Sequence, residues 1–200
     1  MPVKKLLLMV ILFITVNVSG QNNFTYSPEK PKAGEAITIS YAPAGNLANT
    51  TAKLEGVVYR LGDKGQMTDE LDLKKAGDKY IAVVKTDTTD NFIFFSFSAD
   101  KKFDNNFNSG YWIPLYDGDK IKKRANANTA AFYQFYGRDA GVEPNNDKAL
   151  QYMDEEFKLY PEFKKNDLVQ YVRLYSRVKK EEAPAFIQKE IEEEIKSGLK

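Results

Sequence analysis

Hydrophobic and polar residues alternate along the first part of the chain, from about residue 24 to residue 118. A period of two is typical of β-strands, whose successive side chains point to opposite faces of a sheet. The stretches between the alternating runs, such as PEKPKAG, LGDKGQ and TDTTD, carry the residues that favour tight turns. The pattern therefore predicts a β-sandwich of immunoglobulin-like type with about seven strands. The expected strands lie near residues 24–27, 37–41, 57–61, 67–73, 80–84, 93–99 and 111–115.

The phenylalanine-rich run NFIFFSFSAD carries apolar residues on both faces of its predicted strand. Phe92 and Phe94 lie on one face, and Ser96 and Ser98 are expected to return that face to solvent. A strand that is covered on both faces lies at the centre of a fold, so we expect the helical half to cover this one through Phe132 or Phe135. The residues expected on the opposite, core-facing side are Ile93, Phe95, Phe97 and Ala99.

After Arg124 the spacing of hydrophobic residues lengthens to the period of α-helices. The segment NANTAAFYQFYGRDAG predicts a short helix that ends near Gly137. A second helix is predicted to end at Pro161, because proline cannot continue a helix. The apolar stripe of this second helix consists of Leu150, Met153, Phe157 and Tyr160.

Two more helices are predicted before the C-terminus. Asn166 or Asp167 is expected to cap the first of them. Pro184 suits the first turn of the last helix and Gly198 suits its end. The stripe of the earlier helix consists of Leu168, Tyr171, Val172 and Tyr175. The residues expected to face inward from the last helix are Phe186, Ile187, Ile191 and Ile195.

The two patterns divide the chain into an immunoglobulin-like domain at residues 21–123 and an all-α region at residues 124–200. Helices of about a dozen residues with short connections are typical of helical hairpins and of tetratricopeptide-like repeats. The glutamates and lysines around the apolar stripes, including Asp154/Glu155/Glu156 and Glu192/Glu193/Glu194, are expected to form solvated faces.

The first 20 residues have the layout of a secretory signal peptide, with Lys4 and Lys5 before an apolar run and small residues at its exit. The alternative is an uncleaved membrane anchor, but the run is shorter than the roughly 20 residues of a membrane span. No cysteine follows that could carry a lipid. The sequence therefore predicts an exported protein, periplasmic or extracellular, that begins at Gln21 and stays off the membrane after cleavage.

The composition restricts the possible partners and chemistry. Without Lys4 and Lys5 of the signal, 27 basic side chains remain against 28 acidic ones, so a net charge near −1 argues against nucleic-acid binding. The chain has no cysteine and no histidine. It therefore has no thiol nucleophile, no Ser-His-Asp triad and no ordinary zinc site. We expect no catalytic residue, no cofactor and no metal. A hydrolase that depends on carboxylates is a third-ranked alternative.

The segment DNNFNSGYW allows three interpretations. A metal loop would use Asp104 and the nearby amides Asn105, Asn106 and Asn108, but calcium loops usually supply several carboxylates. A sugar-binding platform would need exposed rings from Tyr111, Trp112 and Tyr116, although Tyr111 shares the predicted core face. A tight connection between two strands, with Gly110 at a positive φ, is the interpretation that we favour.

Three patterns resemble one family. The pieces F.Y.P..P.AGE.I.ISY, D.N...GYW..LYDGD and KAL...DEEFKLYPEF are similar to the N-terminal region of exported Bacteroidetes-type TlpA-like thiol-disulfide oxidoreductases. The resemblance implies a β-rich module and tetratricopeptide-like helices that precede a thioredoxin domain. This chain has no C-x-x-C motif, so no redox residue is carried over. The chain is then either an N-terminal piece of such a protein or a relative without the catalytic domain.

These inferences predict a non-catalytic, exported module that positions or recognises a protein or peptide partner. The alternative is a carbohydrate-binding module that uses exposed aromatic side chains near Trp112. A homodimer through the last helix is also expected, because its stripe is more apolar than one neighbouring helix can cover. The predicted ligand or partner surface consists of Trp112, Tyr116, Ile187, Ile191 and Ile195.

Overall fold

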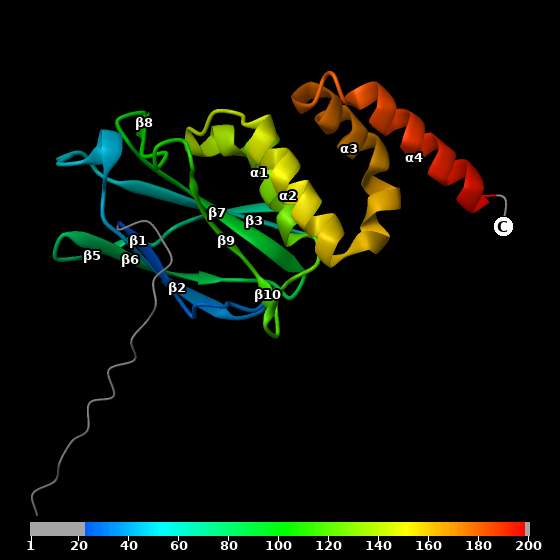
Figure 1. Cartoon of the computed structure of the whole chain (residues 1–200). Coiled ribbons are helices and arrows are strands. Elements are labelled where there is room, and N and C mark those ends of the chain that lie inside the picture. The colour runs from blue at the N-terminus through cyan, green and yellow to red at the C-terminus, as the bar shows by residue number, and fades with distance from the viewer. Residues whose placement is uncertain (1–22, 199–200) are drawn as a thin grey trace, which may run out of the picture.

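A computed structural model of the chain describes residues 23–198, in which eleven strands precede four α-helices (Figure 1). The predicted signal peptide and its cleavage site lie outside the described residues. Within residues 23–198, no helix combines the length and hydrophobicity needed to cross a bilayer. The β-rich first part and the helical C-terminal part follow the order that the sequence predicts.

All strand pairs are antiparallel and most belong to two sheets. The four-stranded sheet has the order β1 (Phe24–Ser27), β2 (Ala36–Tyr41), β6 (Lys79–Lys85), β5 (Lys74–Ala76). The five-stranded sheet has the order β4 (Gly65–Glu70), β3 (Glu55–Gly62), β7 (Asp90–Ala99), β8 (Lys102–Phe103), and β9 (Tyr111–Pro114) also pairs with β7. A small hairpin consists of β10 (Tyr116–Asp117) and β11 (Lys120–Ile121).

The seven predicted runs correspond to β1, β2, β3, β4, β6, β7 and β9. Periodicity missed β5, β8, β10 and β11, because strands of two or three residues are too short to show an alternation. Side chains of both sheets form one apolar cluster. In this cluster the Tyr41 ring of β2 stacks on the Phe97 ring of β7, with 3.7 Å between ring centroids.

Strand β7 is buried on both faces, as the sequence predicts. Phe92 and Phe94 of β7 contact Phe132 in the first helix, at 6.1 and 5.1 Å between ring centroids. Phe135, the other candidate for this cover, is 52% exposed. The expectation that Ser96 returns to solvent is wrong, since Ser96 is only 4% exposed.

The helices follow one another along the chain, and each packs on the one before it. Helices α1 and α2 cover the five-stranded sheet, while α4 lies farthest from the strands (Figure 1). Because residues of β3 and β7 share a second apolar cluster with α1, α2 and α3, the domain boundary at residue 123 stays a prediction. The helices are α1 (Ala125–Gln134), α2 (Asn146–Leu159), α3 (Lys164–Val178) and α4 (Ala183–Gly198), with 3₁₀ turns at Gly45–Leu47, Tyr136–Ala140 and Pro161–Phe163.

The predicted end of α2 is confirmed, but the predicted start of α3 is wrong. Asn166 and Asp167 do not cap α3, because the 3₁₀ turn at Pro161–Phe163 leads directly into a helix that starts at Lys164. Asp167 instead forms an ion pair with Arg124. The sequence also missed Leu174, which is 1% exposed and is the most buried residue of α3.

The expected places of Pro184 in the first turn of α4 and of Phe186 on its inward side are confirmed, whereas the inward orientation expected for Ile191 and Ile195 is wrong. Ile191 and Ile195 are 54% and 56% exposed. Helix α4 turns Phe186, as expected, and Glu190 toward α3. The Phe186 ring stacks on Tyr175, with 4.2 Å between centroids, and Glu190 pairs with Lys164 at 2.6 Å.

Candidate functional site

Asp104 lies at the start of the loop between β8 and β9, and the residue is 3% exposed. Its Oδ2 accepts hydrogen bonds from the hydroxyls of Tyr41 (2.7 Å) and Tyr111 (2.9 Å) and from the Ala44 N–H (3.0 Å). Its Oδ1 accepts from the Asn106 N–H at 3.1 Å. Oδ2 therefore joins β2 and β9 to this loop, and Oδ1 holds the backbone of the loop itself.

The tyrosines around Asp104 are held in their neutral form. Burial raises the pKa of Tyr41 first, and the hydrogen bond to Asp104 and its charge raise that pKa further. Burial likewise raises the pKa of Tyr111, which also bonds to Asp104. Neutral phenols are donors, so each can hold the carboxylate without losing its proton. In the part of the chain that the structure describes, no group of three or more acidic side chains could hold a metal.

The loop after Asp104 is a tight connection, as we favoured from the sequence. The Asn106 side chain donates to the Gly110 carbonyl at 2.9 Å, and Asn105 donates to the Gly141 carbonyl at 2.9 Å. Gly110 has a φ of +70°, and a Cβ at this position would lie 2.4 Å from the Phe132 ring. Only glycine fits such a close approach at a positive φ.

The same loop exposes an aromatic side chain that the sequence analysis missed. Phe107 is 92% exposed, and its φ of +50° lies between positive φ values at Asn106 and Asn108. Bulky residues rarely adopt this conformation. The polar character of DNNFNSG concealed this ring, because periodicity carries no information about a single residue at the tip of a turn.

Trp112 is half-buried beneath the helices. Its ring lies 5.9 Å from that of Phe92 and 5.7 Å from that of Tyr152, measured between centroids. Its Nε1–H donates to the Tyr133 hydroxyl at 3.2 Å. Tyr116 lies in the β10–β11 hairpin, and among the ring contacts of residues 23–198 Trp112 is not paired with it. The structure therefore does not bring these two rings together as one platform.

Glu156 of α2 is fully buried, so its expected place on the surface is wrong. Its carboxylate accepts backbone hydrogen bonds from Arg124 (2.7 Å), the residue before α1, and from Asn126 (3.2 Å) and Ala127 (3.3 Å) in the first turn of α1. The residue before α1, Arg124, provides no side-chain cap of its own. Glu156 thus satisfies N–H groups that a helix start leaves without partners, and its charge suits that end of the helix dipole.

We expect Glu156→Ala to lower the free energy of unfolding by about 1–3 kcal/mol, because buried N–H groups lose their acceptor. Urea unfolding measures this loss. Glu155→Ala is the matched control, since Glu155 is its exposed neighbour in α2. Equal stability of Glu156→Ala and the unmodified protein would show that water replaces the carboxylate.

The pH dependence of this contribution has a definite sign. Burial raises the pKa of Glu156 above its ordinary value of 4.5, although the backbone donors and Arg124 oppose that shift. The folded state then holds this proton more tightly than the unfolded state does. The contribution of Glu156 to stability is therefore full below its ordinary pKa and decreases as the pH rises through the folded-state pKa. As the pH rises over that range, we expect the unmodified protein to lose stability relative to the Glu156→Gln variant, which has no carboxyl group to titrate at this position.

The other sequence-predicted partner residues lie on α4. Ile187 is half-buried, and Ile191 and Ile195 follow it at four-residue intervals on the exposed side. At 100° per residue, Pro184, Gln188 and Gly198 project near this stripe. Ile187, Ile191 and Ile195 thus form an apolar stripe that is more than half exposed at Ile191 and Ile195.

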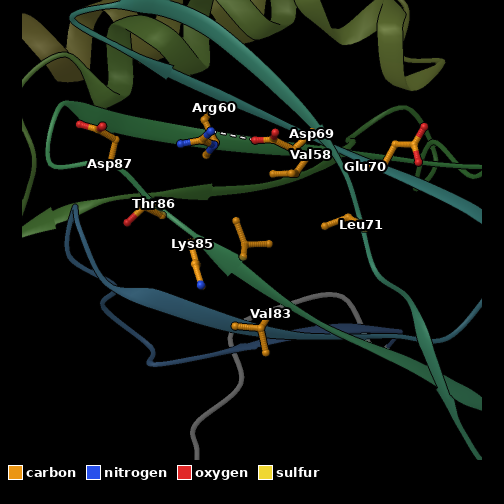
Figure 2. Close-up of a pocket in the computed structure, with 10 residues that line it drawn as sticks. Val58, Arg60, Asp69, Glu70, Leu71, Val83, Lys85, Thr86 and Asp87 are labelled. Atoms are coloured by element: carbon orange, nitrogen blue, oxygen red, sulfur yellow. Dashed lines mark hydrogen bonds and ion pairs between the residues drawn. The ribbon is translucent and has the colours of Figure 1, made fainter.

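A cleft of about 400 Å³ opens between the edges of the two sheets, away from the helices (Figure 2). It is bordered by β3 and β4 of one sheet and by β6 of the other, with the turn at Thr86–Asp87 at one end. The sequence analysis did not find this cleft, because no motif marks it.

Comparison with known proteins assigns no family to this chain. No model of a protein family matches the sequence, and no characterised protein matches it significantly. The resemblance to the region before the thioredoxin domain of TlpA-like proteins therefore stays a prediction.

Proposed function

We propose that this chain is an exported, non-catalytic module that recognises or positions a protein partner, and that its β-rich part is an immunoglobulin-like sandwich. Two antiparallel sheets that share one apolar core support the sandwich assignment. Buried carboxylates with structural partners support the non-catalytic role, since Asp104 and Glu156 both accept several protein hydrogen bonds. The proposal includes a relation to the region that precedes the thioredoxin domain in TlpA-like proteins.

The exposed stripe of α4 is the single observation that carries the proposed interaction. Ile191 and Ile195 are both more than half exposed, although burial of an isoleucine side chain is worth about 1.5–3 kcal/mol. The occupant that we propose is a second copy of the chain. Ile187 and Ile195 are equally far from Ile191 in sequence, so an antiparallel pair of α4 helices places Ile191 on its own counterpart and Ile187 on Ile195.

The alternative, a carbohydrate-binding module centred on Trp112 and Tyr116, has less support. The Trp112 ring packs against Phe92 and Tyr152, whereas a sugar platform requires an accessible aromatic face. Phe107 is the exposed ring in this region, and it has no second aromatic ring near it among the described ring contacts.

We expect the protein without residues 1–20 to dimerise reversibly, with a dissociation constant on the order of 100 µM, since only part of each isoleucine remains to be buried. Sedimentation velocity over a range of concentrations measures this association. Ile191→Lys should give a monomer at every concentration while unfolding at the same urea concentration as the unmodified protein.

Lys189→Gln is the matched control, because Lys189 projects about 160° away from Ile191 around the helix. It should leave the dimer unchanged. A monomer of the unmodified protein at all concentrations would refute the interaction through α4.

A further inference from the structure

The cleft between the sheets has an open strand edge along one side. Strand β5 pairs with β6 only as far as Lys74 opposite Ile81, so within residues 23–198 no strand pairs with β6 beyond Ile81 on that side. The Thr86 N–H donates to the Glu35 carbonyl, toward β2. Because backbone groups alternate in direction along an antiparallel strand, Val83 and Lys85 direct their N–H and C=O groups away from β2, toward the open edge.

The wall opposite this edge is apolar near its centre. Val58 of β3 and Leu71, which follows β4, line the cleft across from Val84 of β6. Val58 and Val84 belong to the core shared by the two sheets, and Leu71 packs against that core. The cleft is therefore an extension of the apolar core that opens to solvent between two strand edges, as Figure 2 shows.

Arg60 provides an unused hydrogen-bond donor in the cleft. Its guanidinium pairs with Asp69 at 2.8 Å and with Asp90 at 3.2 Å. Its Nε–H is buried and has no partner among the described residues. Buried donors without an acceptor are rare and costly, so a ligand acceptor that reached this group after a shift of the 15%-exposed Arg60 side chain would remove that cost.

The charges around the cleft favour one kind of occupant. Asp69 and Asp90 already balance the charge of Arg60. The remaining charged groups of the lining are Glu70, Asp87 and Lys85, and Asp87 also pairs with Lys64. Counted with Lys64 and Asp90, four carboxylates face three cations in and beside the cleft, so its net charge is −1, which disfavours an acidic ligand. The complementary ligand has basic ends and a neutral hydrogen-bond acceptor in its interior.

We propose that this cleft binds an extended, uncharged-to-basic peptide segment of a partner protein, which adds as a strand to β6 at Val83 and Lys85. Main-chain hydrogen bonds to the open edge hold the segment, as in other cases of strand addition. An aliphatic side chain packs on Val58 and Leu71, and a neutral acceptor, such as an amide oxygen, reaches the Arg60 Nε–H. The proposal specifies the partner of the recognition module proposed above, but it uses a surface separate from α4.

The test uses the capped peptide acetyl-Lys-Thr-Val-Thr-Asn-Thr-Lys-amide as the probe, titrated into the ¹⁵N-labelled protein without residues 1–20. We expect amide shifts to concentrate at β6 and at Leu71. At a peptide concentration ten times the dissociation constant, hydrogen exchange of the Val83 and Lys85 amides should slow by about tenfold. The same peptide with glutamate in place of both lysines should bind at least about tenfold more weakly.

Two protein variants define the site. Val83→Pro removes one edge N–H that does not face β2, and it should abolish the peptide-induced shifts. Ile191→Lys should bind the peptide as the unmodified protein does. Loss of the α4 dimer and loss of peptide binding at the cleft can therefore be told apart. Unchanged exchange at Val83 and Lys85 in the unmodified protein, or shifts confined to α4, would overturn the proposal without any variant.

Discussion

Replacing Phe92 with alanine is expected to lower the free energy of unfolding by about 3–5 kcal/mol, as truncation of a fully buried aromatic side chain does. Phe92 is 0% exposed and contacts Phe94, Trp112 and Phe132, with centroid distances of 6.3, 5.9 and 6.1 Å. The cavity would lie between β7 and the helices. We therefore expect faster proteolysis of the helical part as well as a lower urea midpoint.

Phe135→Ala is the matched control for this experiment, because it removes the same side chain at a position that is 52% exposed. It should change the stability by less than about 1 kcal/mol. If Phe92→Ala altered neither stability nor protease sensitivity, the sheets and the helices would be independent units.

Much of the fold could be predicted from local patterns. The alternation in Ile37, Ile39 and Tyr41 identifies a strand with one buried face, because neighbouring side chains on a strand point to opposite sides. The end of α2 could be predicted for a similar reason, since Pro161 acts on the backbone beside it. Features that depend on covalently adjacent residues are visible in the sequence.

The polar anchors of the fold could not be predicted in this way. The partners of Asp104 and Glu156 lie far along the chain, since Tyr41 and Asp104 are 63 positions apart and Arg124 and Glu156 are 32 positions apart. A carboxylate in a polar loop and a glutamate among acidic neighbours resemble surface residues until the fold brings donors to them. Burial of such groups follows from tertiary packing, which periodicity does not encode.

The two proposed interaction surfaces also differ in how far local sequence patterns predict them. The isoleucine stripe of α4 is visible in the sequence, but its exposure depends on the Lys164–Glu190 ion pair and the Tyr175–Phe186 stack, which turn another side of the helix toward α3. The cleft depends on where β5 stops pairing with β6. No local pattern specifies that point, because the residues on both sides of it can continue a strand.

Asp104→Ala is expected to destabilise the β-rich part by about 2–5 kcal/mol, because four donors lose their acceptor and at least two of them are buried phenols. The hydroxyls of Tyr41 and Tyr111 point at one carboxylate oxygen, and both side chains are no more than 1% exposed. The Tyr111 oxygen still accepts a hydrogen bond from the Asn23 side chain, but the O–H groups of both tyrosines lose their acceptor, so both contribute to the loss.

Urea unfolding and the near-ultraviolet circular dichroism of the tyrosines measure this effect together. Asp117→Ala, at an exposed aspartate of the β10–β11 hairpin, is the control and should leave both signals unchanged. Asp104→Asn keeps one acceptor oxygen but replaces the other with an amide NH2 group, which cannot accept from a hydroxyl, so its stability should lie between those of Asp104→Ala and the unmodified protein. Tyr41→Phe in the Asp104→Ala background should then cost little further, because the hydroxyl that it removes no longer has its acceptor. A full additional loss from Tyr41→Phe in that background would show that the Tyr41 hydroxyl has another partner and that Asp104 is not the group that joins β2 to β9.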